Sequence, residues 1–394
     1  MVVAAALSAC SPSPPTAVAE HPQAVTNGSN DAGDPGVVAL LQGSTLVCTA
    51  TLVAPRLILT AAHCLADGAM PTVYFGSTPG DGAPRLAISA VRRHPSFDAA
   101  QPTNDIAMAL LADPAPASAT AAPLPAAPPA AGAMLRLVGF GRTSAGDTTA
   151  PRKRVGTATL SSLTATELAF LPSPSQTCEG DSGGPAFATA GGVESIVGVT
   201  SSGDAACATM ARDIRVDAFA DAFIAPFVAA TTEGAAGAGD RCWYAGNCGA
   251  SAGECAPATD DATLSFCAPS CDGGCPSGLH CVAGSDGRKL CRHPTPSPGA
   301  QGSRCSDDAT CAAGHCVAHG AGSPTVCATS CFADLPGFCG PAFDCLAVAG
   351  GAQSACFARA TGGCDFAGGG APLRSPMLVA ALLLWLRRRP LSRA

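Results

Sequence analysis

The uneven distribution of cysteine is the feature that most constrains how this chain can fold. The 394 residues include 22 cysteines. Only four of them lie between residues 25 and 231, whereas sixteen lie between residues 242 and 356. Cysteine this dense is typical of exported proteins whose small domains are held by disulfides, because a reducing cytosol keeps thiols free. The chain is therefore predicted to be secreted and to change architecture near residue 240.

The dense region consists of two sets of eight cysteines that repeat at an offset of 63 residues. Each set spans about 50 residues, too few to bury a self-sufficient core. Four disulfides per set, at roughly 2–4 kcal/mol each, are expected to supply most of the stability. Eight cysteines allow about 105 pairings, so the connectivity stays open. The first set comprises cysteines 242, 248, 255, 267, 271, 275, 281 and 291, and the second comprises cysteines 305, 311, 316, 327, 331, 339, 345 and 356.

Two histidines beside these cysteines raise zinc binding as an alternative. His280 precedes Cys281, and His315 precedes Cys316. Structural zinc sites usually present two short, paired knuckles. Two matching octets favour disulfides instead, so we expect no metal and no other cofactor. The region is expected either to bind an extracellular protein or glycan, or to act as a stalk, and the sequence does not choose between these roles.

Short apolar segments rich in leucine and β-branched residues run through the region before residue 231, separated by glycine and proline. This spacing is typical of an all-β barrel or sandwich. The stretch 112–133 is almost wholly alanine, proline and serine, so it is expected to connect two halves. The predicted strands are residues 37–41, 45–53, 57–60, 72–75, 86–91, 106–111, 135–140, 154–160, 167–171 and 195–200.

A closing helix is predicted after the last strand, because Phe219, Phe223 and Phe227 recur at helical spacing. Asp217 is available near its start as an N-cap. Pro226 is expected to bend or shorten it.

The charge balance bears on the choice of partner. The formal net charge is −7 with only 13% charged residues, and lysine and arginine form no basic run longer than three residues, the one at 387–389 lying near the C-terminus. Nucleic acid is therefore not expected as a partner.

Three strings in the first region supply a histidine, an aspartate and a serine, in that order. They are Thr-Ala-Ala-His-Cys at 60–64, Asn-Asp-Ile-Ala at 104–107 and Cys-Glu-Gly-Asp-Ser-Gly-Gly-Pro at 178–185. A serine hydroxyl is a poor nucleophile until a base takes its proton, and a histidine is a reliable base only when a carboxylate holds its other ring nitrogen. Ser182, His63 and Asp105 are the candidates for these roles. Glycines around the serine let the amides of Gly180 and Ser182 converge as an oxyanion hole.

On these strings, the region from about residue 25 to 230 resembles the trypsin/chymotrypsin family of serine proteases. The resemblance implies two six-stranded antiparallel barrels with a C-terminal helix, here followed by the two small disulfide-rich modules. It implies a serine endopeptidase that cleaves protein or peptide substrates through an acyl-enzyme, with Ser182 as nucleophile, His63 as base and Asp105 as orienting acid. It further implies two bridges, Cys48 to Cys64 and Cys178 to Cys207.

The same resemblance implies activation from a zymogen. Residues 25–28, Val-Thr-Asn-Gly, are similar to the family's mature start, which places cleavage after Ala24. The new ammonium group of Val25 is then expected to pair with Asp181, the residue before the serine. Because Ala24 is neither Arg nor Lys, a trypsin-like activator is not expected.

The predicted specificity departs from that of trypsin. Gln176 stands six positions before the serine, where trypsin has an acid, so a preference for Lys or Arg is not expected. On the substrate-binding strand, Thr200, Ser201 and Ser202 replace the usual Ser-aromatic-Gly pattern. We expect the Thr200 hydroxyl to reach Asp105 and Ser202 to narrow the pocket, which favours a small or uncharged residue before the scissile bond.

A second hypothesis is a catalytically silent protein that uses this fold only for binding. Such proteins usually lack a triad residue, whereas His63, Asp105 and Ser182 are all present here. The sequence therefore favours the enzyme.

Both ends of the chain resemble signals for a bacterial surface. Residues 7–10, Leu-Ser-Ala-Cys, are similar to the lipobox of lipoproteins, which makes Cys10 a lipidation candidate. No Lys or Arg precedes the short apolar run, so a start codon placed too far downstream and an ordinary apolar N-terminus are the alternatives. Residues 362–394 begin with Gly-Gly-Cys, in which the cysteine is Cys364, and continue with a run of three glycines at 368–370, an apolar run and a run of three arginines at 387–389. This segment resembles the C-terminal sorting signals of myxobacterial and related surface proteins.

The apolar run at 377–386 is too short to span a bilayer as a helix, and a plain hydrophobic tail is the alternative. We expect secretion to the bacterial cell envelope, with membrane association through the N-terminal lipid, the C-terminal segment or both. The expected divisions are a signal and propeptide at 1–24, the protease domain at 25–231, a linker at 232–239, a first module at 240–293, a linker at 294–302, a second module at 303–358 and a sorting segment at 359–394.

Overall fold

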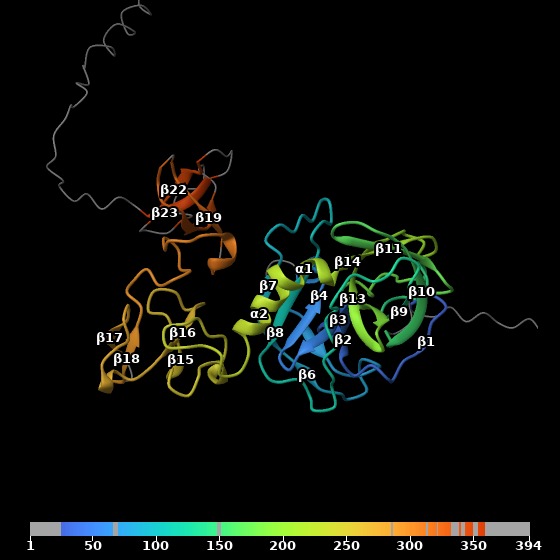
Figure 1. The fold of residues 1–394 in the computed structure, drawn as a ribbon, viewed down its shortest axis with the longest axis horizontal. Coiled ribbons are helices and arrows are strands. Elements are labelled where there is room, and N and C mark those ends of the chain that lie inside the picture. The colour runs from blue at the N-terminus through green and yellow to red at the C-terminus, as the bar shows by residue number, and fades with distance from the viewer. Residues whose placement is uncertain are drawn as a thin grey trace, which may run out of the picture.

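Two β-barrels, a short helical segment and a chain of small hairpins make up the computed structural model of the protein (Figure 1). The structure describes residues 25–358, except residues 66–69, 148–150, 285–286, 313, 321, 332–338, 340–342 and 350–353. Cys10, Ala24, Cys364 and the apolar run at 377–386 lie outside the described residues.

The first barrel is a seven-stranded antiparallel sheet with the strand order β6-β5-β2-β3-β4-β8-β7. Its two edge strands, β6 and β7, are separated by one residue, so a single bent stretch of chain closes the barrel and the count becomes the predicted six. The strands are β2 (Val37–Gln42), β3 (Thr45–Ala54), β4 (Leu57–Thr60), β5 (Thr72–Tyr74), β6 (Arg85–Leu86), β7 (Ile88–Arg93) and β8 (Ala107–Leu111).

The second barrel closes because β10 pairs with both β9 and β11, in the order β10-β11-β14-β13-β12-β9. A short strand, β1, adds to the outside of β10. The strands are β1 (Ser29–Asn30), β9 (Met134–Gly139), β10 (Arg154–Leu163), β11 (Glu167–Pro172), β12 (Pro185–Ala190), β13 (Val193–Gly203) and β14 (Ala211–Arg215). The all-β prediction with two barrels is confirmed.

The apolar pattern explains which strands were predictable. β2, β4 and β8 are almost continuously buried and apolar, and all three were expected. β12 and β14 have no counterpart among the predicted strands. Half of the residues of β12 are alanine, and three of the five residues of β14 are charged, so neither strand carries a strong apolar signal. Both segments form strands because they pair with neighbouring strands of the barrel.

A helical segment closes the barrels as predicted, but its start differs. It consists of α1 (Val216–Phe219), a π-helical turn η2 (Ala220–Ile224) and α2 (Ala225–Ala230). Asp217 does not cap it, because its carboxylate forms an ion pair with Arg215 at 2.6 Å. Pro226 stands in the first turn of α2, where its missing N–H costs little, and the π-turn precedes it.

The cysteine-rich region folds as four small units. In each octet the first cysteine bonds to the third, the second to the fourth, the fifth to the seventh and the sixth to the eighth. Within each unit, the last two cysteines lie directly opposite each other on two antiparallel strands. The strands are β15 (Glu254–Pro257), β16 (Ser265–Ala268), β17 (His280–Ala283), β18 (Lys289–Arg292), β19 (His315–Val317), β20 (Val326–Ala328), β21 (Ser330–Cys331), β22 (Phe343–Ala347) and β23 (Ser354–Ala358).

Short 3-10 turns complete the described elements: η1 (Ala62–Leu65), η3 (Ala245–Asn247), η4 (Cys271–Gly273) and η5 (Asp308–Thr310). No helix in the described ranges is long and apolar enough to cross a membrane.

The first cysteine-rich unit packs on the helical segment. Asn247 is fully buried, and its amide donates to the carbonyls of Ala230 (3.1 Å) and Thr232 (2.8 Å) at the end of α2. The ring of Trp243 meets Phe227 edge-on at 5.2 Å. The predicted linker at 232–239 is hydrogen-bonded to this unit at several positions, including Ala236 N to Asn247 O at 3.0 Å.

Candidate active site

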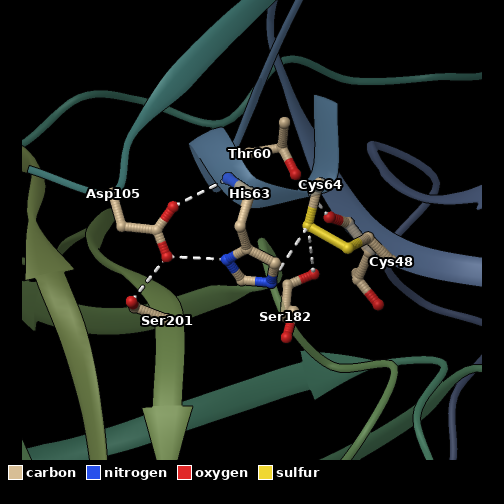
Figure 2. Close-up of polar contacts among 8 residues, drawn as sticks. Cys48, Thr60, His63, Cys64, Asp105, Ser182 and Ser201 are labelled. Carbon is tan, nitrogen blue, oxygen red and sulfur yellow. Dashed lines mark hydrogen bonds and ion pairs between the residues drawn. A yellow bond between two sulfur atoms is a disulfide. The ribbon is translucent and has the colours of Figure 1, made fainter. Parts of the chain in front are cut away.

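The three motif strings meet between the two barrels. His63 lies in η1, directly after β4, and Asp105 lies two residues before β8. Ser182 lies in the loop that enters β12 of the other barrel. Figure 2 shows the imidazole of His63 between the Asp105 carboxylate and Ser182. The fold therefore brings together residues that are far apart in the sequence.

Asp105 holds the histidine at two points. Its Oδ2 is 2.7 Å from His63 Nδ1, and its Oδ1 accepts the backbone N–H of His63 at 2.9 Å. The aspartate is fully buried, whereas the histidine side chain is 37% exposed. Burial by itself raises the pKa of Asp105, but the hydrogen bonds from His63 and Ser201 outweigh it, so the pKa lies below its ordinary value. The carboxylate is thus ionised and fixes the tautomer that leaves Nε2 as the base.

Ser201, and not Thr200, reaches Asp105, which corrects the sequence prediction. The Ser201 hydroxyl donates to Asp105 Oδ2 at 2.6 Å (Figure 2). The register between β13 and β14 shifts between Thr200 and Ser202, so Ser201 is the extra residue of a β-bulge. A bulge turns the following side chain to the other face of the strand. The Thr200 hydroxyl is buried on the opposite face, toward Asp213 of β14.

Thr49 of β3 positions the serine loop and carries no motif signal. Its N–H donates to the Ser182 carbonyl at 2.9 Å, and its hydroxyl donates to the Gly180 carbonyl at 2.9 Å. The N–H of Phe140, which follows β9, donates to the same hydroxyl at 3.1 Å. One buried threonine of the first barrel therefore clamps the loop of the second. Thr49 directly follows Cys48 in the sequence, but nothing in the sequence indicates that it contacts the serine loop.

The amides of Gly180 and Ser182 are free to bind an oxyanion. Among the backbone hydrogen bonds of the described residues, neither N–H has an acceptor. Gly180 has φ +96°, and a side chain there would meet Leu46 at 2.8 Å, so the turn requires glycine. Within the same described part, no hydrogen bond joins His63 Nε2 to the Ser182 hydroxyl. Such bonds often tighten only when substrate binds.

Asp181 is buried beneath the serine loop. Its carboxylate accepts the N–H groups of Gly141 (2.8 Å) and Cys178 (2.9 Å), and the N–H of Val25 also donates to it. Burial raises the pKa of Asp181 to about 7 despite these donors. Val25 is itself fully buried, with φ +42°, which strains a β-branched residue. The structure thus places Val25 against the aspartate that was expected to pair with it.

Gln176 lies fully buried in the loop before the serine. Its side-chain N–H donates to Asp204 Oδ2 at 2.8 Å, while no described residue donates to its side-chain oxygen Oε1. Asp204 also accepts the backbone N–H groups of Thr209 and Met210, which hold its pKa far below the ordinary value. Ser202, the residue after the bulge, is half-buried beside a small pocket of about 130 Å³.

Asp213 is a buried acid that sequence analysis missed, because it belongs to no motif. It pairs with Thr200 across β13 and β14 and is fully buried, and among the described residues no group forms a well-aligned hydrogen bond with its carboxylate oxygens. Burial raises its pKa to about 8, although the Thr200 hydroxyl acts in the opposite direction, and the nearby charge of Asp181 raises the pKa further. Two interacting acids therefore lie within the second barrel beneath the serine loop.

All four cysteines of this region are disulfide-bonded, Cys48 to Cys64 and Cys178 to Cys207. The first bridge ties the histidine turn to β3. Within the described residues, every group of side chains with metal-ligand spacing consists of disulfide-bonded cysteines, joined in one case by His63. These sulfur atoms offer no thiolate, so the arrangement does not fit a zinc site.

Comparison with known proteins matches the first half of the chain. A family model described as Trypsin matches residues 25–223, about half of the 394 residues. Serine protease SP24D of Anopheles gambiae is 32% identical over 171 residues, which cover 39% of this chain and 62% of that protein. Human kallikrein-7 is 34% identical over 169 residues, which cover 38% of this chain and 66% of that protein. The chain thus spans less than two thirds of the length of these curated relatives. Among solved structures, neuropsin, a serine protease expressed in the limbic system of mouse brain, matches with a TM-score of 0.45 and 21% identity, covering 49% of this chain and 96% of that one.

Proposed function

Because the chain belongs to the trypsin family, we propose that it is a serine-type endopeptidase that hydrolyses peptide bonds through an acyl-enzyme. The observation that carries the proposal is the contact between His63 Nδ1 and the buried Asp105 carboxylate at 2.7 Å, with Ser182 on the other side of the ring (Figure 2). Protein or peptide substrates follow from the same relationship.

In the proposed mechanism, the Ser182 hydroxyl attacks the carbonyl carbon of the scissile bond while His63 Nε2 takes its proton. Asp105 stays ionised and stabilises the resulting imidazolium. The negative oxygen of the tetrahedral intermediate accepts the free N–H groups of Gly180 and Ser182. His63 then donates its proton to the leaving amine, and the peptide C–N bond breaks. Water, activated by the same histidine, hydrolyses the ester.

A fluorophosphonate probe tests the proposal against the silent binding protein. After proteolytic activation, Ser182 should be labelled and a generic protein substrate should be cleaved. Ser182→Ala should abolish labelling and reduce kcat/KM by about 10³-fold or more. An activated, folded chain that neither labels nor cleaves would favour the binding protein.

Activation by cleavage after Ala24 is part of the proposal. Its support is the buried position of Val25 and the donation of its N–H to Asp181. Cleavage would turn this amide into an ammonium group, which pairs with a carboxylate more strongly than a neutral donor does. N-terminal sequencing of active material should begin at Val25.

For specificity, we propose a small or uncharged residue before the scissile bond. The neutral amide of Gln176 at the predicted pocket floor supports this preference. Asp204 lies beside it, but its charge is already shared among Gln176 and several backbone N–H groups. A peptide-library profile dominated by Arg and Lys would contradict the proposal.

Ten disulfides in the described part of the chain fit an extracellular protein. We further propose attachment to a bacterial cell envelope through a lipid on Cys10, the segment 359–394, or both. Intact-mass measurement of cell-bound and released forms would identify which end is modified.

A further inference from the structure

A groove of about 640 Å³ lies between the first barrel and the cysteine-rich units. One wall comes from β7 and the loop after it, including Arg92 and Phe97. The other wall comes from Arg241 and Trp243 of the first octet and from the turn at Asp308 of the second. Figure 1 shows the cysteine-rich hairpins on the side of the first barrel that carries β7 and β8. The groove therefore exists only where three distant parts of the sequence meet.

The groove is lined by three arginines, Arg92, Arg93 and Arg241. Burial lowers the pKa of both Arg92 and Arg241, and the positive charge of Arg92 lowers the pKa of Arg241 further. The charges of Asp307 on Arg92 and of Asp261 on Arg241 act in the opposite direction without overcoming this effect. Within the described residues, neither of these two forms a salt bridge. Bringing like charges together with partial loss of water is unfavourable unless an anion complements them.

Aromatic rings hold both guanidinium groups in place. Arg241 lies 4.1 Å from the ring centre of Trp243, and Arg92 lies 5.7 Å from that of Phe227. Cation–π contacts of this kind stabilise the charge without neutralising it. The acid in the groove is already engaged, because Asp308 accepts from His315 Nδ1 at 2.7 Å and from the Cys316 N–H at 2.7 Å.

Apolar side chains lie among the arginines. Met70 is 59% exposed, and Phe97 and Trp243 also line the groove. A densely sulfated glycan would place negative charge against Asp308 and leave these apolar groups uncovered. A peptide that alternates acidic and apolar residues complements both the arginines and the apolar side chains of the groove. A guanidinium group can bind a carboxylate through two parallel hydrogen bonds.

We propose that this groove binds an acidic, partly apolar segment of a polypeptide partner, with carboxylates at Arg92 and Arg241 and apolar side chains against Met70 and Trp243. The loop that forms one wall continues to the candidate active site. The N–H of His94 donates to the Ile106 carbonyl at 3.0 Å, next to Asp105. A partner bound in the groove is therefore held beside the loop that carries the orienting acid.

The test uses the full chain carrying Ser182→Ala, so that the probe cannot be cleaved and binding is measured independently of catalysis. A fluorescein-labelled peptide of alternating Glu with Leu and Phe is titrated and followed by anisotropy, beside the same peptide with Gln in place of Glu. Only the acidic peptide should bind, and added salt should weaken it. Arg92→Gln with Arg241→Gln should weaken binding at least tenfold. Arg85→Gln with Lys289→Gln, which removes two exposed charges outside the groove, should change it less than twofold.

Three results would overturn the proposal: equal binding of the Gln peptide, unchanged binding by the folded Arg92→Gln/Arg241→Gln chain, or groove-dependent binding of heparin without binding of the peptide. Thermal unfolding of each variant checks the fold. If the Arg92→Gln/Arg241→Gln variant does not fold, Arg92→Lys with Arg241→Lys provides the test. This variant keeps both positive charges but loses the bidentate guanidinium–carboxylate contacts, so it should bind the acidic peptide more weakly than the parent chain.

Discussion

At the scale of single residues, Ser201 and Thr200 show how one backbone irregularity reassigns a role. Both carry hydroxyl groups and both are on β13. Because of the bulge, the Ser201 hydroxyl points toward the Asp105 carboxylate, whereas the Thr200 side chain faces Asp213. Because hydrogen bonds to a charged acceptor are worth about 1.5–3 kcal/mol, the difference is measurable.

Ser201→Ala is predicted to lower kcat/KM about tenfold, because Asp105 loses a donor that stabilises its charge and orientation. Thr200→Val, which removes the other hydroxyl at nearly constant volume, should change kcat/KM less than threefold. Steady-state kinetics with one peptide substrate would compare them. The reverse order of effects would restore the assignment to Thr200.

Asp213 predicts how the stability of the uncleaved chain depends on pH. The folded chain keeps its proton up to about pH 8, whereas an unfolded aspartate releases it near its ordinary pKa of 3.8. In this window the unfolded state binds fewer protons, so the free energy of unfolding should fall as the pH rises from about 4 to 8. Urea unfolding of the uncleaved Ser182→Ala chain at several pH values would measure the slope.

Asp213→Asn should flatten that slope, because the amide does not titrate. Asp181, whose pKa is raised to about 7, should leave a smaller slope of the same sign. The exposed, matched change Asp98→Asn should leave the slope unaltered. A stability that rises with pH in both chains would contradict the assignment of buried, protonated acids.

At the scale of elements, the end of α2 depends on a side chain from outside the barrels. The last carbonyls of a helix have no partner within it. Asn247 supplies one for Ala230 and Thr232, and its own carbonyl accepts the N–H of Trp243 at 3.1 Å. The first cysteine-rich unit therefore completes the helix that closes the protease fold.

Asn247→Ala is predicted to reduce the free energy of unfolding by about 2–4 kcal/mol, because the carbonyls of Ala230 and Thr232 and the N–H of Trp243 all lose their hydrogen-bond partner. Gln42→Ala, at the exposed end of β2, should cost less than about 0.5 kcal/mol. Urea unfolding of both variants in the Ser182→Ala background would compare them. Equal stabilities would mean that water replaces the asparagine.

At the scale of the whole molecule, the first cysteine-rich unit behaves as part of the protease core. Trp243 and Tyr244 pack against the apolar cluster of the first barrel, and the Tyr244 hydroxyl donates to the Thr231 carbonyl at 3.0 Å. The guanidinium of Arg56 lies 4.5 Å from the Tyr244 ring centre. The boundary at residue 231 therefore cuts through a packed interface.

A chain that ends at residue 231 is predicted to unfold at a Tm lower by about 5 °C or more than the full chain, because it exposes Phe227 and leaves α2 uncapped. A chain that ends at residue 302 keeps the first octet and should match the full chain within about 2 °C. Differential scanning calorimetry would compare the three. Equal Tm values for all three would assign the interface no energetic role.

The sequence by itself determined the features that local strings carry. The three motif strings identify His63, Asp105 and Ser182, because each string holds its reactive residue in a short, recognisable context. The apolar strands and the cysteine density likewise predict an all-β region followed by disulfide-bonded modules, since periodicity and composition are local properties. The two barrels were implied by the resemblance of the motif strings to the trypsin/chymotrypsin family.

Only the tertiary structure decided the features that depend on pairing across the fold. The bulge at Ser201 arises from the register of β13 against β14, which no single strand encodes. Thr49 and Asp213 carry no motif, and burial beside the serine loop gives them their importance. The groove at Arg92 and Arg241 exists because residues about 150 positions apart are folded against each other. The interaction energy of a charge depends on the charges and the solvent around it, which only the folded structure determines.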